Sequence, residues 1–381
     1  MNASEVVIAG ASFAGLAVAR ELPGRAVLID PEEIGDGQTS ACGAPAGVLS
    51  ALGAEEAIQE KHDALVIHTP GRDATWPLSE PFCTFDYRAC CRAALAGTGA
   101  RVMRAAVLGR VSTTRAKDAR ESGMRRRRIA AVTSHGEVPA RVLVDCSGWR
   151  AALAWGETAR GGRGRTDRAR YFGLESESPA AFSRGLHFYF WPEIVRDGYA
   201  WAFPAGRTTR IGVLSYRGRT RLGDAVGALL DRLGMPRGPL HGGFLQAGLR
   251  PPVVDGVFVV GDAAGHCLPL TGEGIRPAVL AGRVCGSALR DALDGRTTLD
   301  EAAARYRAFV MHQRRRHHVL AWAARAAFVL PARVVGVLAA WIGRPGPLRL
   351  FMSHYLDLFA LRDAGYSRDR GNAHGPVACT R

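Results

Sequence analysis

The chain has 381 residues, of which 47% are hydrophobic and 22% are charged. At about 150 residues per domain this length predicts two domains or one composite fold, and the composition excludes both a disordered chain and a protein made mostly of membrane spans. Lys and Arg number 50 against 35 Asp and Glu, which gives a net charge of +15, and only Lys61 and Lys117 are lysines. This balance is typical of a protein that meets an anionic ligand, a membrane surface or nucleic acid, but also of a compositional bias toward arginine.

The eight cysteines contain no CxxC pair and show no zinc-ligand spacing with histidine. The N-terminus enters a strand-like run within a few residues, so we expect no cleavable leader. We therefore expect reduced thiols, no metal site and a cytoplasmic location.

The first elements predict the beginning of a βαβ unit. Residues 6–9 form a short β-branched run of the kind that is buried on both faces of a parallel sheet. A glycine-bearing turn and a helix-like stretch to Leu22 follow, and a second apolar run covers residues 26–29. The order strand, helix, strand predicts a nucleotide-binding type of domain.

Later segments alternate between the two sheet types. Strands are expected near 101–113 and 129–134, with the arginine-rich segment 115–128 as a solvated connection between them. Short alternating segments between about 165 and 250 predict an antiparallel sheet, and residues 257–260 read as another buried parallel strand. The last ninety residues have helical patterns.

The first cofactor signature consists of Gly10, Ala11, Ser12, Phe13, Ala14 and Gly15. It is a GxGxxG pattern with serine at the second glycine position, between a predicted strand and helix. Gly10 permits a tight turn, Ser12 leaves room for backbone N–H groups to approach a pyrophosphate, and Gly15 lets helix and strand pack closely. Asp30, twenty positions after Gly10, can accept a hydrogen bond from a ribose hydroxyl. The segment predicts a dinucleotide site.

The second signature consists of Gly261, Asp262, Gly272, Gly274 and Ile275. A strand ends in Gly-Asp, and a Pro/Gly turn then opens a helix-like stretch to Leu293, so that one carboxylate and a row of free helix N–H groups face the same ligand. The two signatures together resemble the FAD-binding motifs of glutathione-reductase-like flavoproteins. In those proteins the aspartate holds the flavin ribityl chain and the helix N-terminus faces the flavin pyrimidine.

This resemblance implies FAD as the cofactor and an α/β fold. A Rossmann-like FAD-binding domain would be interleaved with an antiparallel β-sheet substrate domain and closed by C-terminal helices. The expected FAD-binding domain is discontinuous and covers residues 1–60, 85–160 and 250–295. The expected substrate domain covers 61–84 and 161–249, and the helical region covers 296–381.

Three segments are similar to geranylgeranyl reductases: residues 198–204 resemble their YxWxFP motif, residues 261–275 their version of the Gly-Asp region, and residues 41–43 their Cys-Gly segment beside the flavin. The resemblance implies reduction of carbon–carbon double bonds of a prenyl or other hydrophobic substrate by hydride transfer from reduced FAD. It also implies NAD(P)H or a separate reductase as the electron donor, because no second nucleotide motif is visible.

Aromatic residues of the first of these segments are expected to form the substrate pocket. On a strand, Tyr199, Trp201 and Phe203 point to one face, where they would line an apolar wall together with the adjacent Pro204. The alternative is that the three rings are ordinary sheet core.

Three single residues are assigned by the same resemblance. Cys42 occupies the position from which a proton could reach the reduced double bond; the alternative is a small buried hydrophobe. Arg88 resembles an arginine that neighbours FAD, or else it is a solvated surface residue. His266 is expected to be a turn residue that packs near the cofactor.

The alternative function is that of an FAD-dependent monooxygenase that hydroxylates an aromatic or polycyclic small molecule in secondary metabolism. A halogenase is a further alternative, since residues 145–150 and a drifted version of the WxWxIP motif at 199–204 are similar to flavin-dependent halogenases. Halogenases rely on a lysine that carries the halogen, and Lys61 and Lys117 are poor candidates for it. No helix-turn-helix, zinc or aromatic–basic RNA motif supports nucleic-acid binding.

The C-terminal region raises the question of membrane contact. Residues 314–318 are basic, and the mostly apolar stretch 319–343 follows them. Arg325, Arg333 and Pro331 interrupt the stretch, so a bilayer span is not expected. We expect two helices broken at Pro331 that either pack on the substrate domain or lie peripherally on an anionic lipid surface.

Overall fold

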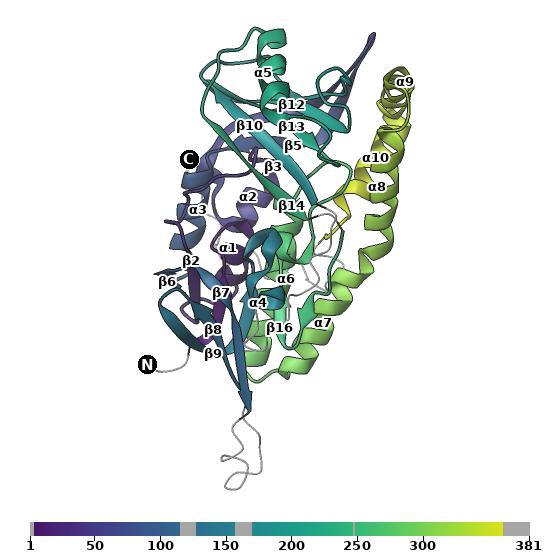
Figure 1. Cartoon of the computed structure of the whole chain (residues 1–381). Coiled ribbons are helices and arrows are strands. Elements are labelled where there is room, and N and C mark those ends of the chain that lie inside the picture. The colour runs from purple at the N-terminus through teal and green to yellow at the C-terminus, as the bar shows by residue number, and fades with distance from the viewer. Residues whose placement is uncertain (1–3, 115–126, 157–169, 247, 361–381) are drawn as a thin grey trace, which may run out of the picture.

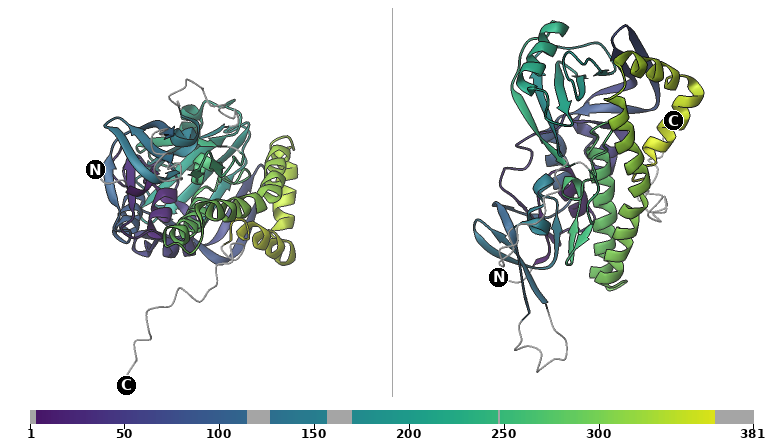
Figure 2. Two further views of the ribbon diagram at one scale, coloured as in Figure 1. Left: turned by 90° about the horizontal axis from the view of Figure 1, so that it is seen from below. Right: turned by 45° about the vertical axis from the view of Figure 1, so that its right-hand side comes forward.

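The computed structural model describes residues 4–114, 127–156, 170–246 and 248–360. Two eight-stranded sheets lie end to end, and helices run along one side of both (Figure 1). The chain passes from the first sheet to the second and back, and its last helices extend along the second (Figure 2, right).

The first sheet has the strand order β15-β16-β9-β1-β2-β6, and the β7–β8 hairpin adds to β9. Its strands are β1 (Ser4–Ala9), β2 (Ala26–Asp30), β6 (Arg101–Arg104), β7 (Val107–Thr114), β8 (Arg127–Thr133), β9 (Gly136–Asp145), β15 (Val253–Val254) and β16 (Val257–Val259). β1 pairs in parallel with β2 and β9, β2 with β6, and β16 with β9. The carboxyl ends of these strands therefore meet at one edge, where ligands bind in open α/β sheets.

Two predictions for this sheet need correction. The single strand expected at 101–113 is two strands, because β6 pairs with β2 whereas β7 pairs with β8. Most of the arginine-rich connection, residues 115–126, lies outside the described residues, and Arg127 and Arg128 belong to β8.

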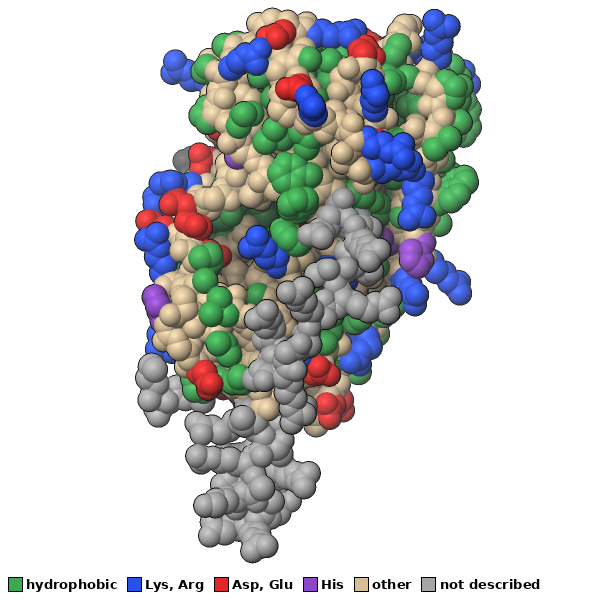
Figure 3. Space-filling view, viewed as in Figure 1, with side chains coloured by type: hydrophobic (Ala, Val, Ile, Leu, Met, Phe, Trp, Pro, Cys, Tyr) green, Lys and Arg blue, Asp and Glu red, His purple; other side chains and the backbone are tan. Residues whose placement is uncertain are grey.

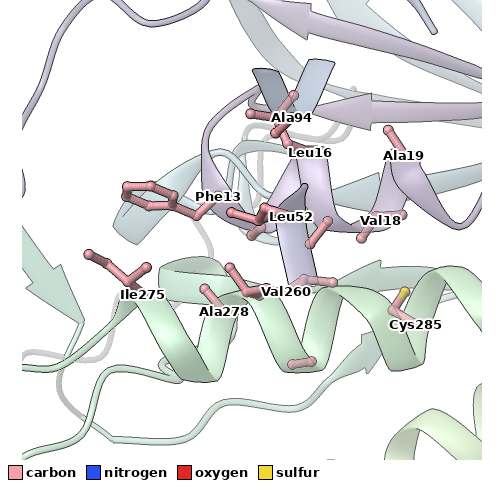
Figure 4. Close-up of a cluster of buried hydrophobic side chains, with 14 of the residues drawn as sticks. Phe13, Leu16, Val18, Ala19, Leu52, Ala94, Val260, Ile275, Ala278 and Cys285 are labelled. Atoms are coloured by element: carbon pink, nitrogen blue, oxygen red, sulfur yellow. The ribbon is translucent and has the colours of Figure 1, made fainter. Parts of the chain in front are cut away.

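Helices that cover the first sheet are α1 (Phe13–Arg20), α2 (Ala46–Leu52), α3 (Tyr87–Ala96), α6 (Ile275–Leu293) and α7 (Leu299–His312), with the short α4 (Ala152–Trp155) near its edge. Phe13 and Val18 of α1 lie toward Ile275, Ala278 and Cys285 of α6 in one apolar cluster, and Leu16 of α1 lies beside Ala94 of α3 (Figure 4). This packing joins the two segments that carry the cofactor signatures, although about 250 residues separate them.

The second sheet has the order β14-β10-β13-β12-β11-β4-β5-β3. Its strands are β3 (Gly43–Pro45), β4 (Ile58–Thr69), β5 (Arg72–Phe85), β10 (Arg170–Ser178), β11 (Leu186–Tyr189), β12 (Gly198–Ala205), β13 (Thr208–Ser215) and β14 (Leu240–Gln246). Neighbours are antiparallel except β4 and β11, so the antiparallel prediction for this region is correct. Residues 43–45, which the sequence places with the first domain, pair with β5 in this sheet. α5 (Leu222–Leu233) packs on one face.

The last helices are α8 (Arg314–Ala327), α9 (Ala332–Ile342) and α10 (Pro345–Leu356). The break between α8 and α9 falls at Pro331, as predicted. α9 packs on the β4–β5 hairpin, where the indole Nε1 of Trp76 donates to the carbonyl of Ala339 at 2.8 Å. Among the residues the structure describes, no helix has both the length and the apolar character needed to cross a bilayer.

Candidate functional site

A cavity of about 1010 Å³ lies between the two sheets and extends to α8 and α9. Most of the predicted site residues line it: Gly10, Ser12, Phe13, Ala14, Asp30, Cys42, Tyr199, Trp201, Phe203, Gly261, Asp262, Gly272, Gly274 and Ile275. Three predicted residues, Gly15, Arg88 and Pro204, do not belong to its lining. The fold thus brings both cofactor signatures and the aromatic segment to one space.

The first signature forms a tight backbone crossing at the end of β1. Gly10 has φ +94, and a Cβ atom there would lie 2.2 Å from the carbonyl oxygen of Cys146. A Cβ atom at Gly15 would lie 2.0 Å from the carbonyl oxygen of Gly10. The absence of a side chain at Gly15 therefore lets α1 pack closely against the turn, on the side away from the cavity. The backbone of residues 10–14 faces the cavity.

Asp30 and Ser12 order this turn. The carboxylate of Asp30 accepts hydrogen bonds from the N–H of Ala11 at 2.8 Å and of Glu32 at 3.0 Å. Each carboxylate oxygen keeps a further lone pair for a ligand in the cavity. The hydroxyl of Tyr87 donates to Ser12 Oγ at 3.1 Å, so this tyrosine, which the sequence reading does not single out, holds the turn from α3.

The second signature places a carboxyl group and a helix N-terminus beside each other. Burial raises the pKa of Asp262 to about 6, against a lowering by Arg250. Gly274 is the N-cap of α6 and supplies no side-chain cap, so the first N–H groups of the helix remain available. A Cβ atom at Gly274 would lie 3.6 Å from Asp262 Oδ1, which shows how close the two groups are.

The three predicted aromatic residues lie on one face of β12. Tyr199, Trp201 and Phe203 are 5%, 8% and 8% exposed, and all three line the cavity. The neighbouring Phe188 of β11 lies 5.8 Å from the Tyr199 ring and 5.2 Å from the Phe203 ring. They belong to a packed cluster of the sheet as well as to the cavity, so the two sequence interpretations are compatible.

The prediction that Pro204 lines the substrate pocket is wrong. Because side chains alternate along a strand, Pro204 points away from the face that Phe203 occupies. Its carbonyl oxygen accepts from Thr84 Oγ1 at 2.6 Å, and His62 Nε2 lies 3.1 Å from it. Pro204 thus fixes β12 to β4 and β5.

Cys42 is fully buried and has φ +51. Its thiol donates to the carbonyl of Ser40 at 3.4 Å, and burial raises the pKa of this thiol well above its ordinary value. The buried Arg210, which sequence reasoning missed, donates to the carbonyl of Ala41 at 3.2 Å and holds the loop in place. Cys42 therefore faces the cavity as a protonated thiol rather than as a nucleophilic thiolate.

A second missed feature is a polar group beside the apolar wall, on the same sheet. Trp201 Nε1 donates to Glu175 at 2.7 Å, and His241 Nε2 lies 2.8 Å from the other oxygen of Glu175. Glu175 and His241 are direct cross-strand partners in the β10–β14 pair, and both line the cavity. No motif marks them in the sequence; only the strand register brings them together.

Arg88 lies outside the cavity lining. It is exposed and forms an ion pair of 2.6 Å with Asp36, which does line the cavity. A role of Arg88 toward a cofactor would therefore run through the loop that carries Asp36.

The loop 261–274 is anchored by the C-terminal helices. Buried Arg276 pairs with Glu273 at 2.8 Å and donates to the carbonyl of Leu358 at 2.6 Å. The hydroxyl of Tyr355 in α10 hydrogen-bonds to Glu273 and lies 2.8 Å from Thr271 Oγ1. The C-terminal region, which sequence reasoning leaves apart from the cofactor signature, therefore shapes it.

Two buried histidines support the same loop. His266 Nδ1 accepts from the N–H of Gly261 at 3.2 Å, which agrees with a turn residue. His317 of α8 lies 3.1 Å from the carbonyl oxygen of Cys267 through its Nε2. Burial lowers the pKa of His266 to about 3 and that of His317 to about 4.

We predict that these histidines destabilise the protein in acid. Above about pH 6.5 both are neutral in the folded and the unfolded chain; below it the unfolded chain binds two protons that the folded chain does not. The free energy of unfolding should therefore fall by up to about 2.7 kcal/mol per pH unit between pH 6.5 and 4. Urea titrations of His317→Gln should show about half that slope, whereas His318→Gln, at an exposed site, should keep it; equal slopes in both would contradict the assignment.

Two curated relatives share part of the sequence. The digeranylgeranylglycerophospholipid reductase of Methanococcus vannielii is 33% identical over 133 residues, which cover 32% of this chain and 33% of the relative. The enzyme of the same name from Methanocaldococcus jannaschii is 35% identical over 119 residues, covering 28% and 30%. The resemblance to geranylgeranyl reductases is confirmed. The matched part spans about a third of the length of these relatives, and no family model matches the chain.

Solved structures match nearly the whole chain. A geranylgeranyl bacteriochlorophyll reductase-like protein of Thermoplasma acidophilum has a TM-score of 0.75 at 18% identity and covers 94% of this chain and 98% of its own. The flavin-dependent brominase Bmp2 has a TM-score of 0.67 at 16% identity over 95% of each chain. PqsL of Pseudomonas aeruginosa, a probable FAD-dependent monooxygenase, has a TM-score of 0.61 at 15% identity, covering 86% and 96%. The predicted α/β flavoprotein fold is confirmed.

Proposed function

We propose that the protein is an FAD-dependent oxidoreductase that reduces carbon–carbon double bonds of a prenyl or similarly hydrophobic substrate. The observation that carries this proposal is the cavity of about 1010 Å³, which joins both cofactor signatures to an apolar aromatic wall. The partial sequence relatives, named as reductases of a prenylated phospholipid, point to the same chemistry.

The cavity offers groups that fit FAD. The open backbone at residues 10–14 suits a pyrophosphate, and Asp30 suits a ribose hydroxyl. The carboxyl of Asp262 makes no side-chain hydrogen bond within the described chain and faces the cavity, where a polyol could donate to it. The uncapped N-terminus of α6 favours negative charge on a ligand. When bound, reduced FAD would supply hydride to the substrate.

The side chains of this protein would hold the substrate and supply the proton. Tyr199, Trp201 and Phe203 would bind an apolar chain and exclude water from it. Two groups could hold the proton that reduction of an alkene needs: the Cys42 thiol and the His241 imidazole on Glu175. The pair of His241 and Glu175 is better suited to proton exchange with solvent, since His241 is only half-buried whereas Cys42 is fully buried.

Monooxygenation is the second candidate, because solved structures of similar fold include the PqsL protein. Halogenation is less well supported, because no lysine among the described residues lines the cavity, from which it could carry a halogen to the substrate. Lys61 is exposed on β4 and does not line the cavity, and Lys117 lies outside the described residues. The electron donor, NAD(P)H or a separate reductase, stays part of the proposal.

Reoxidation of the reduced protein tests the two candidates. The purified flavoprotein would be reduced without oxygen and mixed with a prenylated lipid or quinone while flavin absorbance is followed. We expect reoxidation with formation of a saturated product. Reoxidation with product only when oxygen and an aromatic compound are present would reject the reductase function in favour of the monooxygenase.

We predict that a bulky residue at the α8 end of the cavity blocks long substrates. Ala326 lines the cavity, so Ala326→Trp should lower kcat/KM for a twenty-carbon prenyl chain by about tenfold to a hundredfold, or roughly 1.4–2.7 kcal/mol in transition-state binding. The matched control is Ala321→Trp, on the same helix but outside the lining. Steady-state kinetics with long and short chains would measure the effect. Equal losses in both variants, or for both chain lengths, would contradict this cavity as the substrate site.

We also propose that α8 and α9 lie on an anionic lipid surface. Trp322, Val329 and Trp341 are 71%, 74% and 54% exposed. Residues 314–356 contain seven arginines and no Asp or Glu, and Figure 3 shows basic side chains gathered over α8. Exposed apolar rings beside arginines are typical of peripheral membrane helices. Trp322→Gln/Val329→Gln should weaken co-flotation with anionic liposomes several-fold; co-flotation that is absent in the unaltered protein would reject this contact.

A further inference from the structure

A second hollow, of about 370 Å³, lies between α8 and the turn that follows β13. Its lining consists of Tyr171, Arg196, Asp197, Tyr216, Arg217, Arg219, Ala324, Arg325 and Phe328. None of these residues lines the large cavity, although the hydroxyl of Tyr216 donates at 2.9 Å to the carbonyl of Leu270, which does. The hollow is thus a separate site next to the proposed substrate cavity.

The charge of this hollow is strongly positive. Four arginines face one carboxylate, that of Asp197, which leaves three positive charges. Among the described residues, no carboxylate lies within ion-pair distance of any of the four guanidinium groups. Two exposed arginines of the same domain do have such partners: Arg232 pairs with Glu193 at 2.7 Å, and Arg237 with Asp231 at 2.8 Å. What distinguishes the four arginines is that they line one concave surface without a carboxylate partner among the described residues.

Asp197 acts as an organiser of the loop rather than as a counter-ion. Its carboxylate accepts from Ser215 Oγ at 2.8 Å, from Thr220 Oγ1 at 2.9 Å and from the N–H groups of Arg217 at 2.8 Å and Arg219 at 3.3 Å. Burial opposes its ionisation, but these hydrogen bonds lower its pKa overall. The backbone that carries Arg217 and Arg219 is therefore ordered before any ligand binds, which reduces the entropic cost of binding.

Stacked rings form the apolar side of the hollow. The ring of Tyr216 lies 4.4 Å from that of Tyr171 and 4.6 Å from that of Phe328 in centroid separation. Burial raises the pKa of Tyr171 to about 12, so its hydroxyl stays protonated and can donate a hydrogen bond. An ordered loop, several guanidinium groups in one lining and a phenolic donor are the elements of an oxyanion site.

We propose that the hollow formed by Arg196, Arg217, Arg219 and Arg325 binds a phosphate group. Guanidinium groups suit phosphate because they donate two parallel hydrogen bonds to its oxygens. The phosphate could belong to a lipid headgroup, since the exposed Val329 just after α8 lies close in sequence to Arg325, or to a soluble phosphate or diphosphate. The site requires no flavin, and it stands or falls independently of the proposed reductase activity.

Binding of inorganic diphosphate and of vesicles tests the site at constant ionic strength. Calorimetry would measure diphosphate affinity, and co-sedimentation would compare vesicles of phosphatidylglycerol with vesicles of phosphatidylcholine. We expect Arg217→Gln/Arg325→Gln to weaken at least one of these interactions about tenfold or more. The control, Arg184→Gln/Arg207→Gln, removes the same charge from exposed positions near the other end of β12 and β13 and should change binding less than twofold.

Each outcome decides the proposal. Loss of diphosphate binding alone assigns the site to a soluble phosphate, and loss of phosphatidylglycerol binding, with or without diphosphate, assigns it to a lipid headgroup. Equal losses of binding in both double variants would show that only the net charge of the protein matters and would reject the site. An unaltered protein that binds neither probe would also reject it. Protein that binds phosphate but carries no flavin would reject the proposed function and leave this site standing.

Discussion

Gly10→Ala should abolish flavin binding and destabilise the protein by several kcal/mol. A side chain at φ +94 costs about 1–2 kcal/mol on its own, and the Cβ atom would also lie 2.2 Å from the carbonyl oxygen of Cys146. Relief of that contact requires β1 and β9 to separate at the edge where the cofactor signatures meet. Urea unfolding and the visible absorbance of the purified protein would measure the two losses.

Gly24→Ala provides the matched control. Gly24 has φ +72, but a Cβ atom there would have no neighbour within 4 Å. This variant should therefore pay only the backbone cost, about 1–2 kcal/mol, and keep its flavin. If the two variants lost stability and flavin equally, the close approach at Gly10 would not be the reason that the turn needs glycine.

Sequence reasoning reached the fold and the cofactor signatures because their determinants are local. Buried β-branched runs define β1 and β2, and the glycine turn between β1 and α1 has a fixed spacing. The alternation along β12 correctly placed Tyr199, Trp201 and Phe203 on one face. The same alternation argues against Pro204 as a lining residue.

The residues that sequence reasoning missed depend on contacts between distant segments. Glu175 and His241 meet only through the register of β10 and β14. Arg210 reaches Ala41 across 169 positions. The division at residue 60 likewise could not anticipate that residues 43–45 pair with β5, because a three-residue strand carries almost no periodicity.

The buried pair of Arg276 and Glu273 leads to the second prediction, which concerns stability. Their side chains are 4% and 8% exposed. Arg276 also donates to the carbonyls of Tyr355 in α10 and of Leu358 just after α10. Removal of one partner leaves a buried charge without compensation, which typically costs about 3–5 kcal/mol. Arg276→Met should therefore lower the free energy of unfolding by this amount.

The double variant Arg276→Met/Glu273→Gln separates the lost charge pair from the lost anchorage of α10. If the unpaired Glu273 carboxylate causes the loss, the double variant should recover a large part of the 3–5 kcal/mol. The exposed pair of Arg92 and Glu33 is the control, since Arg92→Met should cost within about 1 kcal/mol. Urea titrations of all four proteins give the comparison. Flavin affinity should fall with stability in these variants, because Glu273 lies between Gly272 and Gly274, next to the N-terminus of α6. Normal flavin affinity in Arg276→Met would show that the contacts of Arg276 with the C-terminal region do not shape the cofactor loop.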